Sequence, residues 1–177
     1  MAPGRAARYK PGMNLKRPTS TMAQLYQRPG FLLRRAHQLS VGLFEQQCAP
    51  WKLTPPQYGV LYVLAHAGDL DQAGLSRALG FDKVTTLRIV RGLEARGLLM
   101  RTASAVDRRR LVLGLTREGR ALLSGVQQAA ANVQERLLSP LQPAEQAQLL
   151  KLLDKLCGGL EEQARVPMAA PGALGSA

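Results

Sequence analysis

The chain has 177 residues, with 24 Lys and Arg against 12 Asp and Glu and a formal net charge of +12. This length is enough for one folded domain with a hydrophobic core. So large a basic surplus favours a polyanionic partner, with nucleic acid as the first candidate and an anionic membrane surface as the second. No stretch approaches the roughly 18 apolar residues that cross a bilayer, and the N-terminus lacks the apolar segment of a signal peptide. We therefore expect a cytoplasmic protein that does not enter a membrane.

Residue types that carry catalysis or hold metals are poorly represented. Cys48 and Cys157 lie far apart, and His37 and His66 are the only histidines, which argues against a disulfide framework and a four-ligand metal site. The acidic residues form no pair on one helix face, and there is no Gly-rich phosphate loop and no recognisable Ser, His and Asp set. We expect a binding protein without a cofactor or metal, and not an enzyme.

Both ends of the chain differ in composition from the middle. Residues 1–27 are rich in Pro, Gly, Ala and basic residues without periodicity, which predicts a basic disordered arm. Residues 165–177 contain mostly Ala, Gly and Pro, which predicts a flexible tail. A single folded domain is expected over residues 28–164.

The folded segment begins with helical periodicity. Apolar residues recur at three- and four-residue spacing in the run from Leu32 to Leu43, which predicts a first helix over residues 31–48. The run Thr54-Pro55-Pro56-Gln57 then supplies a capping Thr, a Pro at the first helical position and a Gln that can close a capping box. A second helix is therefore predicted from residue 55 to about residue 68.

Two further helices are predicted on either side of a short turn. Asp71 can cap a short helix that ends at Gly80, and Asp82 can cap a fourth helix that stops at Gly97. Two helices joined by Gly80-Phe81-Asp82 are typical of a helix-turn-helix.

The periodicity changes after Gly97. Leu98 to Arg101 and Leu111 to Leu115 predict two short strands that flank the polar segment Thr102 to Arg110, which gives a hairpin with a long tip. The expected fold class is therefore mainly α with a small β-wing.

Two helices are predicted after the hairpin. Thr116 can cap a helix that extends to about Leu138, and Pro143 opens the last helix. The leucines between Leu149 and Leu156 give that last helix a wide apolar stripe. Such a stripe needs a partner, either the first helix of the same chain or its counterpart in a second chain.

The fourth predicted helix, residues 83–96, has two different faces when it is plotted at about 100° per residue. The face expected in the core carries Thr86, Ile89, Val90 and Leu93. The opposite face carries Val84, Leu87, Arg88, Arg91 and Ala95. Arg side chains can read guanine in a major groove, and small apolar groups can touch thymine methyls. Lys83, Thr85 and Arg88 lie in the first two turns, where a recognition helix makes base and phosphate contacts. An ordinary solvated face is the alternative.

The hairpin tip contains Asp107-Arg108-Arg109-Arg110. Three adjacent arginines repel one another unless a polyanion is near, and an Arg at a wing tip can enter a narrow minor groove. We expect Asp107 to orient Arg109 through a charge-assisted hydrogen bond. The alternative is a solvated turn.

From Leu75 to Gly119 the chain resembles the MarR family of regulators. The matching runs are Leu75-Ser76-Arg77-Ala78-Leu79-Gly80, Leu93-Glu94-Ala95-Arg96-Gly97-Leu98, and Asp107-Arg108-Arg109 followed by Leu113-Gly114-Leu115-Thr116-Arg117-Glu118-Gly119. The wing pattern D-x-R followed by L-T-x-x-G has predicted helices before and after it. A looser likeness extends from Arg28 to about Leu160.

The resemblance implies a homodimer with a winged helix-turn-helix, residues 54–116, in each subunit. The subunits would meet through N- and C-terminal dimerisation helices, residues 31–48 and 117–160. The resemblance also implies that the dimer binds a palindromic operator in duplex DNA, usually as a repressor. The dimer would release the operator when a small molecule binds. Members of the family often carry Ser or Thr at the positions of Val84 and Leu87 and an aliphatic residue at Thr86, so the operator sequence is not carried over.

The segment Arg28 to His37 also looks like the start of family members that sense aromatic acids. In the family the effector site lies between the dimer-forming helices and the DNA-binding lobe. Candidate residues that offer cations for a carboxylate or rings for stacking are Arg34, Arg35, His37, Trp51, Tyr58, Tyr62 and His66. They predict a small aromatic carboxylate as effector, although packing roles for the histidines, Trp51 and Tyr62 are the alternative.

Two other functions are consistent with the sequence. Oxidation of Cys48 or Cys157 could replace ligand binding as the switch. A non-specific architectural or RNA-binding protein could use the same basic surface. A helix sized for a major groove favours DNA over A-form RNA, whose deep major groove excludes side chains.

Overall fold

The computed structural model describes residues 21–67, 70–104 and 107–169. These residues fall into two compact units, one up to Gln38 and the other from Leu39 onward. The first unit contains α1 (Thr21–Tyr26) and the beginning of α2 (Pro29–Gln47). The composition predicts an irregular arm as far as residue 27, but its last part is helical because the run TMAQLY contains neither Gly nor Pro. The rest of the predicted arm lies outside the described residues.

Four helices of the second unit begin where the sequence predicts, because each has a side-chain cap. They are α3 (Pro55–His66), α4 (Gln72–Leu79), α5 (Lys83–Ala95) and α6 (Arg117–Leu138). At α3 the predicted capping box is present, and the backbone N–H of Thr54 donates to Gln57 Oε1 at 3.0 Å. The backbone N–H groups of Gly74, Thr85 and Gly119 donate to caps at the starts of α4, α5 and α6. Each cap satisfies an amide that has no partner within its helix.

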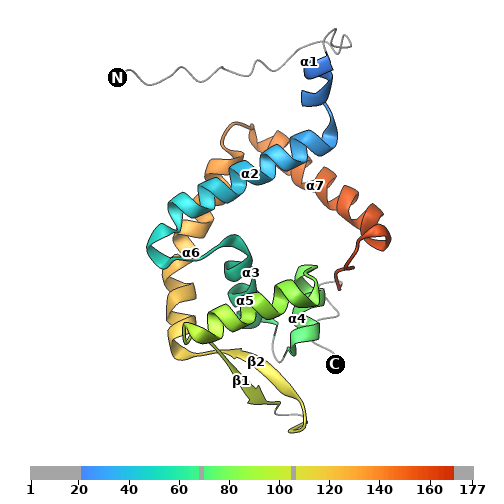
Figure 1. Ribbon diagram of the computed structural model, residues 1–177. Coiled ribbons are helices and arrows are strands. Elements are labelled where there is room, and N and C mark those ends of the chain that lie inside the picture. The colour runs from blue at the N-terminus through green and yellow to red at the C-terminus, as the bar shows by residue number, and fades with distance from the viewer. Residues whose placement is uncertain (1–20, 68–69, 105–106, 170–177) are drawn as a thin grey trace. The chain divides into compact units, whose positions relative to one another are not determined.

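The hairpin follows α5 directly, as Figure 1 shows. Strands β1 (Leu99–Ala103) and β2 (Leu111–Leu115) are antiparallel, and their register pairs Leu99 with Leu115. β1 continues two residues beyond the predicted end because its ladder with β2 continues to Ala103. Leu70 adds a bridge to Leu113, so the segment before α4 is tied to the wing.

The core lies among α3, α4, α5, α6 and the hairpin. Its fully buried side chains are Cys48, Val60, Leu61, Leu75, Thr86, Val90, Leu93 and Val126. A short 3-10 helix, η1 (Ala49–Trp51), joins α2 to the loop before α3. Burial of so many aliphatic groups is the main source of stability for this unit.

α7 (Pro143–Leu160) differs from the other long helices of the second unit because it buries no residue. Its exposed large apolar side chains are Leu149, Leu150, Leu152, Leu156 and Leu160. A second 3-10 helix, η2 (Glu161–Gln163), follows it. The contiguous apolar stripe predicted for the last helix is therefore present and uncovered in the single chain.

Among the described residues, no helix combines the length and the apolar character needed to cross a bilayer. Within the same part of the chain, His, Cys, Asp and Glu side chains form no group of three that could hold a metal ion.

Candidate nucleic-acid interface

The helix-turn-helix consists of α4, the turn Gly80-Phe81-Asp82 and α5 (Figure 1). The turn requires glycine at position 80, where the backbone adopts φ 64° in the left-handed region. Between the helices, the buried hydroxyls of Ser76 and Thr86 lie 2.8 Å apart. The Thr86 hydroxyl donates to the Asp82 carbonyl at 2.9 Å, so Ser76 supplies the proton of the bond between the hydroxyls. This buried network fixes the angle between the two helices.

The faces of α5 agree with the predicted ones. Thr86, Ile89, Val90 and Leu93 are its buried residues. The exposed residues of α5 include Lys83, Val84, Arg88, Arg91 and Ala95. Thr85 and Leu87 are half-buried. Val84 has 77% of its surface exposed, an unusual value for an aliphatic side chain. An exposed face that combines cations with a bare aliphatic group suits a groove better than bulk water.

The wing tip carries three exposed arginines, one of which pairs with Asp71. Arg108 and Arg109 are exposed, and the segment between Ser104 and Arg110 is closed by a backbone bond from Ser104 N–H to Arg110 O at 2.9 Å. The expected bond from Asp107 to Arg109 is present in a different form. Asp107 Oδ1 accepts from the backbone N–H of Arg109 at 3.0 Å and not from its guanidinium. Asp107 therefore shapes the backbone of the tip, as Asp commonly does in turns.

Arg110 has a partner within the protein. Its Nη2 lies 3.3 Å from Asp71 Oδ2, so this arginine pairs with the cap of α4. The N–H of Gly74 and, to a smaller extent, the guanidinium of Arg110 hold the pKa of Asp71 below its usual range. The pair joins the wing to the helix-turn-helix, so Arg110 also helps to position the wing.

Asp71→Asn tests this link. Because the pKa of Asp71 is lowered in the folded protein, its carboxylate stabilises the fold above about pH 4 and loses this contribution as the pH falls. The variant keeps a capping oxygen but no charge, so we expect a loss of less than about 1 kcal/mol at pH 7, since the pair is partly exposed. Urea unfolding at pH 7 and pH 3 measures the difference, which should shrink at pH 3. An equal difference at both pH values contradicts the assignment.

Two further contacts hold α5 against neighbouring segments, and neither was predicted from the sequence. Arg101 on β1 pairs with Glu94 on α5, with Nε 2.8 Å from Oε1. Arg96, at the end of α5, donates to the carbonyls of Lys52 and Trp51 at 2.8 and 3.0 Å. Both Glu94 and Arg96 lie at the C-terminal end of α5, and nothing local in the sequence reveals that the partners of Arg96 are more than 40 positions away.

The predicted effector residues lie in both units. In the first unit, Arg34, Arg35 and His37 are exposed on α2, and the Arg34 guanidinium lies 5.0 Å from the centroid of the Phe31 ring. In the second unit, the rings of Tyr58, Tyr62 and His66 follow one another along α3. Ring centroids are 5.9 Å apart for the two tyrosines and 4.3 Å apart for Tyr62 and His66, which are stacked.

The remaining candidate, Trp51, is half-buried beside α6. A Cβ added to Gly125 would lie 3.0 Å from Trp51 Nε1. The tryptophan is therefore packed against the backbone of α6. Its location agrees with the packing role that was the alternative to a ligand contact.

The two cysteines are placed differently. Cys48 is fully buried, and burial raises the pKa of its thiol. A raised pKa disfavours the thiolate, which is the form that reacts with oxidants. Cys157 is exposed on α7.

Comparison with known proteins supports the interpretation of this geometry. A model of the MarR family matches residues 51–110, which contain the helix-turn-helix, β1 and the tip of the wing. The transcriptional repressor NicR of Pseudomonas putida is 35% identical over 127 residues, which cover 72% of this chain and 80% of that protein.

Solved structures give the same result. The chain is similar to the Bordetella bronchiseptica protein BpsR, whose DNA binding is regulated by 6-hydroxynicotinic acid, with 33% identity and a TM-score of 0.69 over 74% of this chain and 94% of that one. It is also similar to the repressor CouR bound to a 23-mer DNA duplex, with 31% identity and a TM-score of 0.72 over 79% and 99% of the two chains.

The fold, mainly helical with a two-stranded wing, is that of a winged helix-turn-helix transcription regulator. Within this class, the chain belongs to the MarR family.

Proposed function

We propose that the protein is a homodimeric repressor of transcription that binds a palindromic operator and releases it when a small aromatic carboxylate binds. The observation that carries the proposal is the exposed, cationic face of α5, held beside a wing with two exposed arginines. The assigned DNA contacts are Lys83, Val84, Thr85, Leu87, Arg88 and Arg91 on α5, with Arg108 and Arg109 on the wing. Its activity is binding and not catalysis, and it acts in the cytoplasm, where bacterial operators are.

A second copy of the chain is the partner that we assign to the apolar side chains on α7. Leaving Leu150, Leu152 and Leu156 about half-exposed is unfavourable in water, and burial of such groups stabilises a dimer by roughly 25 cal/mol per Å². In a dimer the two α5 helices would enter successive major grooves, about one helical turn of DNA apart, with the wings in the flanking minor grooves. The spacing of the two helices then determines affinity.

Selection from a pool of random duplexes at physiological salt tests the function. The purified protein should retain and enrich a palindromic sequence, because two equivalent reading heads select two equivalent half-sites. Retention without enrichment would favour an architectural DNA-binding protein, in which charge alone provides affinity. Loss of all retention would contradict the proposal.

An effector screen tests the ligand class. The aromatic rings of Tyr58, Tyr62 and His66 along α3 suit an aromatic ligand. The carboxylate part of the proposal rests on the sequence, in which Arg34, Arg35 and His37 offer cations. We expect benzoate-type acids to release the selected operator, and matched benzamides and cyclohexane carboxylates to act far more weakly. A ligand can release the operator if it binds more tightly to a dimer whose α5 helices are wrongly spaced for DNA. The shift in population is set by the difference in the ligand's affinity for the two dimer geometries. Equal release by the acid and the amide would contradict the carboxylate assignment.

Arg109→Ala tests the wing. Its exposed guanidinium is assigned to a phosphate or minor-groove contact that does not depend on the base sequence. We expect weaker binding to every duplex and a slope of log affinity against log salt that is smaller by about one. Titrations of the selected operator and of a random duplex at several salt concentrations measure both effects. Unchanged affinity for both would show that the wing assignment is wrong.

A further inference from the structure

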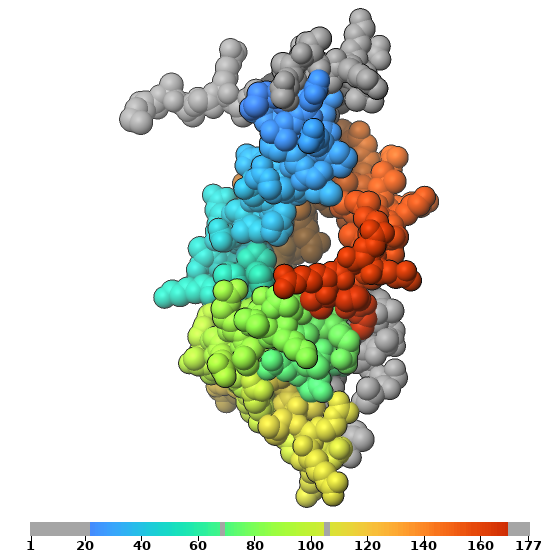
Figure 2. Space-filling model, turned by 45° about the vertical axis from the view of Figure 1, so that its right-hand side comes forward, coloured from blue at the N-terminus to red at the C-terminus, as the bar shows by residue number. Residues whose placement is uncertain are grey.

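The segment that follows η2 returns to the helix-turn-helix. It consists of residues 165–169, Arg165-Val166-Pro167-Met168-Ala169, which we call the C-terminal strap. In the space-filling view the red end of the described chain lies against the green surface of α4 and α5 (Figure 2). The composition predicts a flexible tail from residue 165, and residues 170–177 of that tail lie outside the described residues.

One contact of the strap satisfies a backbone group at the end of α4. The N–H of Ala169 donates to the carbonyl of Arg77 at 3.0 Å. The last carbonyls of a helix have no partner within it, and here Ser76 O is already used by the N–H groups of Gly80 and Phe81. The strap therefore completes the C-terminal cap of α4.

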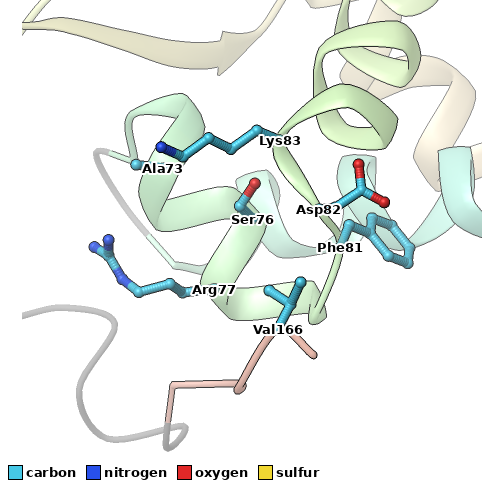
Figure 3. Close-up of a pocket in the computed structure, with 7 residues that line it drawn as sticks. All are labelled: Ala73, Ser76, Arg77, Phe81, Asp82, Lys83 and Val166. Carbon is cyan, nitrogen blue, oxygen red and sulfur yellow. The ribbon is translucent and has the colours of Figure 1, made fainter. Parts of the chain in front are cut away.

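Side chains of the strap contact the turn itself. Val166 lines a shallow cavity of about 300 Å³ together with Ala73, Arg77, Phe81 and Lys83. In Figure 3 the Val166 side chain lies between those of Arg77 and Phe81. A Cβ on Gly80 would lie 2.9 Å from Met168 Cγ, so the methionine side chain packs directly against Gly80 in the turn.

One hydrogen bond and one weaker charge interaction involve the two ends of the strap. The carboxylate of Glu161 accepts from the N–H of Met168, which closes the strap back onto η2. The pKa of Asp82, the cap of α5, is lowered chiefly by hydrogen bonds from Thr85, and the charge of Arg165 contributes in the same direction. Both helices of the helix-turn-helix therefore interact with the strap.

Apart from Lys83, which lines the cavity beside Val166, the exposed residues of α5 that are assigned to DNA contacts lie outside that cavity. Val84 remains 77% exposed, and Arg88 and Arg91 are exposed as well. The strap contacts the end of α4 and the turn, and it continues directly from η2 and α7. A segment in this position can brace the helix-turn-helix without competing with DNA for Val84, Arg88 or Arg91.

We propose that the C-terminal strap docks on the helix-turn-helix and positions α4 and the start of α5 for operator binding. This inference rests on the proposed function for its effect on DNA, but the docking itself can be measured without DNA. A docked strap also connects α7, the proposed dimer helix, to the helix-turn-helix of its own chain.

The test compares Val166→Asp with Ala164→Asp in the full-length protein. Both variants add one negative charge to the same region, but Ala164 is exposed, whereas Val166 lines the cavity. Hydrogen exchange without DNA should be faster by about tenfold at Gly80, Phe81 and Ala169 in Val166→Asp only. Affinity for the selected operator should fall about three- to tenfold relative to Ala164→Asp. The neutral variant Met168→Ala should change both quantities in the same direction.

Each outcome decides the inference. Identical exchange in the two Asp variants would overturn the docking. Faster exchange with unchanged affinity would overturn the positioning role, and tighter binding would show that the strap competes with DNA. If the wild-type protein retains no duplex, the proposed function fails and the positioning role fails with it, while exchange still decides whether the strap is seated.

Discussion

Replacing Gly119 with alanine is expected to destabilise the protein strongly, although it adds only one methyl group. Gly119 lies in the first turn of α6, against the backbone of Leu98 at the start of the hairpin. An added Cβ would overlap the Leu98 carbonyl oxygen and lie 3.0 Å from the carbonyl carbon. That oxygen already accepts a bond from Thr116 N–H at 3.1 Å, so it is not free to move. We expect a loss of about 3 kcal/mol or more and a fall in Tm of roughly 6–12 °C.

Gly92→Ala is the matched control. Gly92 lies inside α5, and a Cβ there would have no neighbour within 4 Å. Alanine is favoured over glycine in a helix by about 0.5–1 kcal/mol, so this variant should be slightly more stable than the wild type. Thermal unfolding of both variants measures the contrast. Equal Tm values would show that α6 does not approach the hairpin as closely as described.

The second large effect is expected for Arg88→Ala, in DNA binding and not in stability. Arg88 is exposed on α5, opposite the buried face that holds Ile89 and Val90. Removing an Arg that reads a base should cost about 1–3 kcal/mol of affinity for the selected operator and relax the sequence preference at one position of each half-site. Repeating the duplex selection with the variant measures both quantities.

Arg120→Ala controls for the loss of charge. Arg120 is also exposed but lies on α6, outside the residues assigned to DNA contacts. Its removal should leave the enriched sequence unchanged and lower affinity only through the general electrostatic attraction. If both variants select the same sequence with the same strength, Arg88 does not read a base.

Much of the helix-turn-helix was predictable because its signals are local. The caps Asp71, Asp82 and Thr116 and the stop at Gly80 each act within a few residues of themselves. The buried face of α5 followed from helical periodicity alone. The structure and the relatives confirm the predicted fold class and the family.

The partners of the charged residues were not predictable in the same way. Arg110 stands in a run of three exposed arginines, and nothing in that run distinguishes the one that pairs with Asp71 from the other two. Asp107 was predicted to bond the Arg109 side chain, but the tight turn brings the Arg109 backbone N–H closer. Charge and spacing indicate which groups seek partners, whereas the path of the chain decides which partners they meet.

The sequence by itself therefore determined the order of the helices, the two-stranded wing and the cationic composition of the proposed DNA-binding surface, because caps, turns and periodicity depend on neighbouring residues. Only the tertiary structure decided which contacts join distant segments: the Ser76–Thr86 bond, the Asp71–Arg110 pair, the close approach of Gly119 to Leu98, and the docking of residues 166–169 on α4. Such contacts depend on packing of a shared core, which brings together groups that no local pattern relates.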